Sequence, residues 1–123
     1  MAEHSLSYDR ERGCVHVVFT GTVDLLAVQQ VAPKVARLCE ETGCRRILND
    51  MSRARVDVSA TDAYASPEIM DKAHISRSFR RALVVPADFA EARFLETASR
   101  NRGHNLKVFF SAEEARAWLE EEG

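Results

Sequence analysis

The stretch LKVFFSAEEARAWL at residues 106–119 contains a strand, a helix start and a helix in direct succession. Apolar side chains alternate from Leu106 to Phe110, which predicts a strand. Residues 111–114 have the spacing of a capping box, in which two side chains accept hydrogen bonds from each other's backbone N–H groups. Apolar residues then recur at helical spacing, and Trp118 among them is expected to anchor the helix against a sheet.

The segment before this stretch shows the same order of strand and helix. Residues 82–85 are continuously apolar, which predicts an interior strand covered on both faces. Asp88 and Glu91 again have capping-box spacing and predict a helix start. In that helix Phe94 belongs to the expected buried stripe, and Gly103 provides the end.

The middle of the chain predicts a short strand followed by a broken helix. Residues 46–51 combine an apolar centre with a polar end, so Asp50 is expected where the strand leaves the sheet. A helical pattern begins at Ser59 and includes Tyr64 among its apolar positions. Ser66–Pro67 interrupts this pattern because proline removes a backbone donor, and two short helical pieces are predicted.

The N-terminal part predicts a hairpin and a longer helix. The alternating segments 5–9 and 14–20 flank a polar loop that ends in glycine, and such loops join antiparallel strands. An amphipathic pattern follows, with Thr22 or Asp24 as its cap and Pro33 as a point where the helix is kinked or split.

Together these elements predict one α/β domain over residues 1–123. Two strands open the chain, and helices then alternate with strands up to a final helix. This order favours a mixed, mostly parallel sheet with an N-terminal antiparallel hairpin at its edge and helices packed on the sheet. A chain of 123 residues is large enough to bury roughly two thirds of its unfolded surface.

The amino-acid composition limits which partners and which cellular location are expected for the protein. The chain has 17 basic and 19 acidic side chains and a net charge of -2, so no global positive field attracts nucleic acid. It has neither an apolar run long enough to span a bilayer nor a secretory signal at its start, and a cytoplasmic protein is expected. Cys14, Cys39 and Cys44 form no disulfide or zinc pattern, which favours reduced packing residues.

No local motif of catalysis is present. The chain lacks a phosphate-binding loop, a dinucleotide glycine motif, a nucleophile elbow and a zincin helix. Each of the four histidines lacks an evident nucleophile or orienting carboxylate, so surface or edge-strand positions are expected. We therefore expect no enzyme activity, no cofactor and no metal site. An enzyme that uses Asp50, Asp57 or His74 is the remaining alternative.

The chain resembles the SpoIIAA-like family of STAS-fold domains in the order of its elements and in the segments 46–50, 82–85 and 107–119. The resemblance covers nearly the whole chain and implies a sheet of four or five strands in a small bacterial protein related to anti-sigma-factor antagonists. In such antagonists the second serine of a loop resembling Asp-Ser-Ser-Gly is phosphorylated. Residues 57–60 read Asp-Val-Ser-Ala, so Ser59 matches that serine whereas the first serine and the glycine are replaced.

The residues Asp50, Asp57 and Ser59 form the candidate site, as a loop that contacts a partner or accepts a phosphate. They are expected on the side where ligands gather in parallel α/β sheets, and Ser59 also suits the role of an N-cap. The predicted function is a non-enzymatic regulatory or protein-interaction module of STAS type. The alternative is a domain for a small apolar or anionic ligand or a lipid, as Sec14-type relatives imply. The exposed face of the edge hairpin is compatible with a symmetric homodimer.

Overall fold

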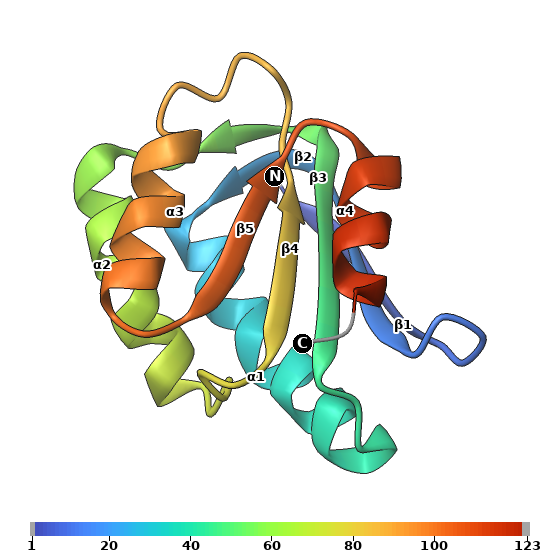
Figure 1. Cartoon of the computed structure of the whole chain (residues 1–123). Helices are drawn as coiled ribbons and strands as arrows, with labels where there is room; N and C mark the ends of the chain where they lie inside the picture. Colours follow the sequence, from blue (N-terminus) through green and yellow to red (C-terminus); the bar gives the residue numbers. More distant parts are fainter. Residues whose placement is uncertain (1, 122–123) are drawn as a thin grey trace.

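The computed structural model describes residues 2–121 and contains one five-stranded mixed sheet (Figure 1). The strands, in their order across the sheet, are β1 (Glu3–Asp9), β2 (Cys14–Asp24), β3 (Arg46–Asp57), β4 (Arg80–Val84) and β5 (Asn105–Phe109). β1 pairs antiparallel with β2, and the other pairings are parallel. The predicted mixed sheet with an antiparallel hairpin at its edge is therefore confirmed.

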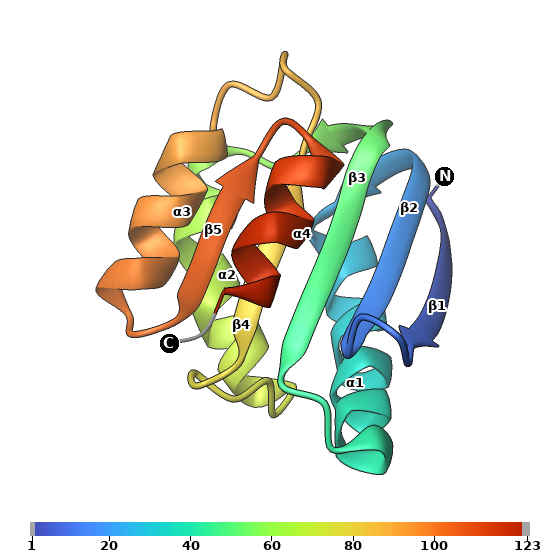
Figure 2. The same ribbon diagram turned by 45° about the vertical axis from the view of Figure 1, so that its right-hand side comes forward.

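Four helices within residues 2–121 cover the two faces of the sheet unequally. They are α1 (Leu25–Thr42), α2 (Ala60–Lys72), α3 (Ala92–Asn101) and α4 (Ala112–Glu120). α1, α2 and α3 lie on one face, whereas α4 lies on the other face over β3 and β4 (Figure 2). The sheet is thus the middle layer of three.

Alternation along the interior strands builds a separate core on each face. In β3, Ile47 faces α1, α2 and α3, while its neighbour Leu48 faces α4, and each is 1% exposed. Leu83 and Val84 divide between the two cores in the same way. Because both faces are covered, the strand residues are apolar in succession, as predicted for 82–85.

Trp118 anchors α4 on the sheet, as predicted. Its indole ring packs against Phe109 of β5 with the ring centroids 5.8 Å apart. The Arg80 guanidinium carbon of β4 lies 4.1 Å from the indole centroid, and Arg80 Nε donates a 3.0 Å hydrogen bond to the Trp118 carbonyl. A cation–π contact and a hydrogen bond therefore join β4 to the last turn of α4.

Two helices continue through a proline, so the predicted break in α2 is wrong. α2 is one helix across Ser66–Pro67, and α1 is not split at Pro33. Pro67 is fully buried, and this burial offsets the missing backbone hydrogen bond. Tyr64, expected in the buried stripe, is 67% exposed because Ala63 and Met70 occupy the buried side of α2.

Helix α3 begins later than predicted. Glu91 is the N-cap residue of this helix and makes no side-chain capping hydrogen bond, so a capping box that starts at Asp88 is wrong. The preceding turn buries Phe89, whose carbonyl accepts a 3.3 Å hydrogen bond from the Ala92 N–H. Phe94 of the expected buried stripe is 43% exposed.

All three cysteines are buried and unpaired, as expected for reduced packing residues. Burial, with Cys44 nearby, raises the pKa of Cys39 to about 12.

Between residues 2 and 121, no helix has the length and apolar character needed to cross a membrane.

Candidate functional site

The candidate residues Asp57 and Ser59 lie where β3 passes into α2. Asp57 is the last residue of β3, and Ser59 is the N-cap of α2 with extended backbone (φ -76°, ψ 172°). Ser59 Oγ accepts a 3.1 Å hydrogen bond from the Asp62 N–H, and the Ser59 N–H donates to Asp62 Oδ2, also at 3.1 Å. This is a complete capping box. Both Asp57 and Ser59 are exposed, so the junction is accessible.

Asp50 does not join the other two candidate residues. The prediction that it ends the strand is wrong, because β2 supplies backbone partners to β3 as far as Asp57. Asp50 lies between Val18 on β2 and Val84 on β4, and about 23 Å of strand separates it from Asp57 at about 3.3 Å per residue. Asp50 Oδ1 accepts a 2.9 Å hydrogen bond from the Ser52 N–H beside a register shift in the pairing with β2. The three predicted residues therefore do not form one loop.

Four exposed residues lie at the start of α2, namely Ser59, Ala60, Thr61 and Tyr64, and we call them the α2 N-terminal surface. Tyr64 is the aromatic residue among these four and lies about 1.4 helical turns beyond the N-cap. This surface was not predicted from the sequence, because the helical pattern indicated a buried position for Tyr64. The signal that finds it is the stripe of small and apolar residues at 63, 66, 67 and 70, which excludes position 64.

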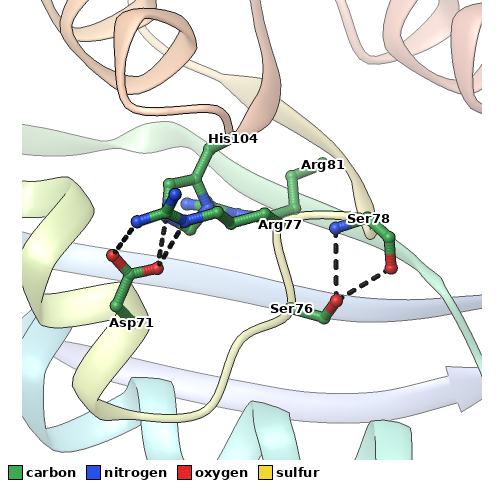
Figure 3. Close-up of polar contacts among 6 residues, drawn as sticks. All are labelled: Asp71, Ser76, Arg77, Ser78, Arg81 and His104. Atoms are coloured by element: carbon green, nitrogen blue, oxygen red, sulfur yellow. Dashed lines mark hydrogen bonds and ion pairs between the residues drawn. The ribbon is translucent and has the colours of Figure 1, made fainter.

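A polar network joins α2 to β4 and to the residue before β5, and sequence reasoning missed it. Asp71 in the last turn of α2 accepts a 2.9 Å hydrogen bond from Arg77 Nη2 and lies 2.9 Å from His104 Nε2 (Figure 3). His104 Nδ1 lies 3.5 Å from Arg81 Nη1. His104 is buried at 2% exposure, so the expected surface or edge-strand position is wrong for it, and Asp71 is its orienting carboxylate.

The network determines the protonation of His104. Arginine only donates hydrogen bonds, so His104 Nδ1 accepts from Arg81 and Nε2 carries the proton donated to Asp71. Burial lowers the pKa of His104 and the charge of Arg81 lowers it further, whereas Asp71 acts in the opposite direction. His104 is therefore neutral at pH 7, and neither ring nitrogen is free to act as a general base.

The charged members of the network differ in their surroundings. The hydrogen bond from Arg77 lowers the pKa of Asp71, whose carboxylate is partly exposed. Burial lowers the pKa of Arg81 to about 10, so this guanidinium stays charged at neutral pH. Arg81 forms no salt bridge within residues 2–121. In the same part of the chain, no group of three His, Cys, Asp or Glu side chains is placed to hold a metal ion.

Known protein structures have a similar architecture. No protein-family model and no curated protein sequence matches the chain. An anti-sigma factor antagonist from Mycobacterium paratuberculosis is similar in structure at 11% identity, with a TM-score of 0.65 over 98% of this chain and 96% of that one. An uncharacterized protein with a SpoIIAA-like fold from Shewanella loihica PV-4 is 16% identical, with a TM-score of 0.63 over 97% of this chain and 95% of that one.

A further similar structure is the Bacillus cell fate determinant SpoIIAA in its phosphorylated form. It is 16% identical, with a TM-score of 0.55 over 95% of this chain and 99% of that one. At such identities the likeness concerns the fold. The five-stranded sheet and the near-complete coverage agree with the resemblance read from the sequence. The chain has the SpoIIAA-like fold of STAS domains.

Proposed function

We propose that the chain is a non-enzymatic regulatory module of STAS type that binds a partner protein through its α2 N-terminal surface. The observation that carries this proposal is Tyr64, which is 67% exposed and lies about 1.4 helical turns after the exposed N-cap Ser59. Tyrosine is enriched at protein interfaces because its ring contributes a large contact area at a low cost in conformational entropy. A similar structure named as an anti-sigma factor antagonist supports a protein as the partner.

The first turn of α2 adds a polar component to this surface. The first N–H groups of any helix lack intrahelical acceptors, and they carry the positive end of the helix dipole. Ala60 and Thr61 are exposed and have short side chains, so a partner can approach this end of the helix closely. The surface therefore suits a partner that presents an apolar groove for Tyr64 and a carboxylate or carbonyl group for the helix start.

We propose Ser59 as a contact residue of this surface. A phosphate on its Oγ would replace the hydrogen bond from the Asp62 N–H and would add negative charge close to the carboxylate of Asp62. The helix dipole favours that charge, but the neighbouring carboxylate opposes it. Intact-mass measurement of the protein purified from its source cells tests for a phosphate at this position, with Ser59→Ala as the control.

The proposed interface is tested by comparing two exposed apolar residues on different helices. A partner captured from source cells is identified and purified, and its Kd is measured by calorimetry for the parent protein, for Tyr64→Ala and for Leu26→Ala. Leu26 lies on α1 and is 59% exposed, so it is a matched control. Loss of a tyrosine hot spot is expected to cost about 2 kcal/mol, or about thirtyfold in Kd. A partner that binds Tyr64→Ala as tightly as the parent contradicts the proposed surface.

The non-enzymatic part of the proposal is supported by His104, the histidine that has an orienting carboxylate. Its two ring nitrogens are both occupied by Arg81 and Asp71, so it is held as a structural link between β4, β5 and α2.

A further inference from the structure

A small cavity lies between the sheet and the helices α1, α2 and α3. Its volume is about 70 Å³. Most of its lining is aliphatic or aromatic, with residues such as Ile47, Leu83 and Leu106. The polar side chains in the lining are Asn49, Ser66 and Arg81. The cavity thus has a mostly apolar wall, and Arg81 is the cationic residue in its lining.

Arg81 reaches this cavity from an interior position of the sheet. On β4 it lies between Ile47 of β3 and Leu106 of β5, and it is 7% exposed. Arginine is rarely this buried without a carboxylate beside it. Among the described residues the guanidinium makes one hydrogen bond, the long contact of 3.5 Å with His104 Nδ1.

The remaining donors of Arg81 define the chemistry of a ligand. A guanidinium has five N–H groups in a planar fork that matches the two oxygens of a carboxylate. The charge of Asp71 favours charged Arg81, but the Asp71 carboxylate takes its side-chain hydrogen bonds from Arg77 and His104 and none from Arg81. An anion bound at Arg81 would compensate the buried charge, and the aliphatic lining would accommodate an apolar chain.

The volume of the cavity limits the size of that chain. A cavity of about 150 Å³ accommodates benzene, so about half that volume suits a molecule of a few non-hydrogen atoms. We infer that the cavity binds a short-chain aliphatic monocarboxylate of acetate to propionate size, with the carboxylate on Arg81 and the alkyl chain against Leu83 and Leu106. This site is separate from the α2 N-terminal surface and does not depend on the proposed partner.

The first test uses the parent protein and three solutes at matched ionic strength. Amide ¹H–¹⁵N spectra are recorded during titration with sodium propionate, with sodium chloride and with 1-propanol. Propionate is expected to give saturable shifts at residues that flank Arg81, including Leu83 and Leu106, while chloride and 1-propanol give none there. Equal shifts with chloride, or saturable binding of 1-propanol as tight as that of propionate, would overturn the assignment of Arg81 as a carboxylate anchor.

The second test changes the anchor and the length of the acid. Arg81→Met keeps a side chain of similar length without the charge, and it is expected to weaken propionate binding by about tenfold to a hundredfold. Arg93→Met is the control, because Arg93 is an exposed arginine on α3. Circular dichroism verifies that each variant is folded. Unchanged propionate binding by folded Arg81→Met, or tighter binding of decanoate than of propionate by the parent, would refute the inferred site.

Discussion

Replacing Ser59 with alanine tests the capping box of α2 separately from any partner. The substitution removes the acceptor of the Asp62 N–H, and the reciprocal bond from the Ser59 N–H to the Asp62 carboxylate loses its counterpart. Loss of an N-cap serine typically costs about 1 kcal/mol of folding free energy. Aspartate caps helices about as well as serine, but here it would lie beside the Asp62 carboxylate, so Ser59→Asp is expected to lose less stability than Ser59→Ala without fully matching the parent.

The assay is equilibrium unfolding in urea, followed by far-ultraviolet circular dichroism. With a dependence of about 1–3 kcal/mol per M urea, a loss of about 1 kcal/mol lowers the midpoint by roughly 0.3–1 M. Ser111→Ala provides an internal scale, because Ser111 caps α4 through a longer hydrogen bond of 3.4 Å and the loss there should be smaller. An unchanged midpoint for Ser59→Ala, or an equal decrease for Ser59→Asp, would refute this account of the helix start.

The remaining predictions concern the anchor of α4, the buried histidine and the core. Arg80→Ala is expected to lower the free energy of unfolding by about 1–2 kcal/mol and to shift Trp118 fluorescence to longer wavelength, because the cation–π contact and a hydrogen bond are lost. The pKa of His104 is lower in the folded chain than its ordinary value of 6.5, so the unfolded chain binds the proton more readily. The stability contributed by neutral His104 is therefore complete above about pH 6.5 and is lost as the pH falls through the folded pKa, and His104→Asn should flatten this part of a pH series of urea midpoints. Leu48→Ala should cost about 3 kcal/mol in urea unfolding, because Leu48 is 1% exposed in the core under α4.

Each of these predictions has a matched control. The control for Arg80→Ala is Arg116→Ala, which removes an arginine of α4. Its Trp118 fluorescence should equal that of the parent protein. His74→Asn changes an exposed histidine with φ 66°, a conformation that asparagine tolerates, and should leave the pH dependence intact. Burial also lowers the pKa of His16, so some acid destabilisation should remain in His104→Asn. Leu26→Ala, at an exposed position, should be nearly neutral. A control that changes as much as its test variant contradicts the corresponding contact.

Local patterns were sufficient to predict the order of the elements. The strand and helix patterns are set by residues close together in the sequence. The pairing of β1 with β2 likewise follows from the short loop between them, which ends at Gly13 in the left-handed region with φ 65°. Element ends were predicted less well. β3 runs on to Asp57 because β2 pairs with it, and Pro67 stays inside α2 because its ring is buried. These outcomes depend on packing partners that a local window does not contain.

The structural positions of the candidate residues were predicted in part. Ser59 is an N-cap, as its position before the helical pattern indicated, and Asp57 lies beside it. Asp50 lies well back along β3, and Tyr64 is on the surface instead of in the core. A shift of one residue around a helix turns a side chain by about 100°, so a small error in the assigned stripe moved Tyr64 from the solvent to the interior.

The sequence by itself determined the α/β order, the antiparallel hairpin, the cap of α2 and the resemblance to the SpoIIAA-like fold, since periodicity and capping are properties of short segments. Only the tertiary structure decided that Asp71 and His104, 33 residues apart, are hydrogen-bonded, and that Arg81 is buried beside the cavity. The burial and pairing of a charged side chain depend on which strands and helices surround it. That information arises when β4 takes its place between β3 and β5 under α2 and α3.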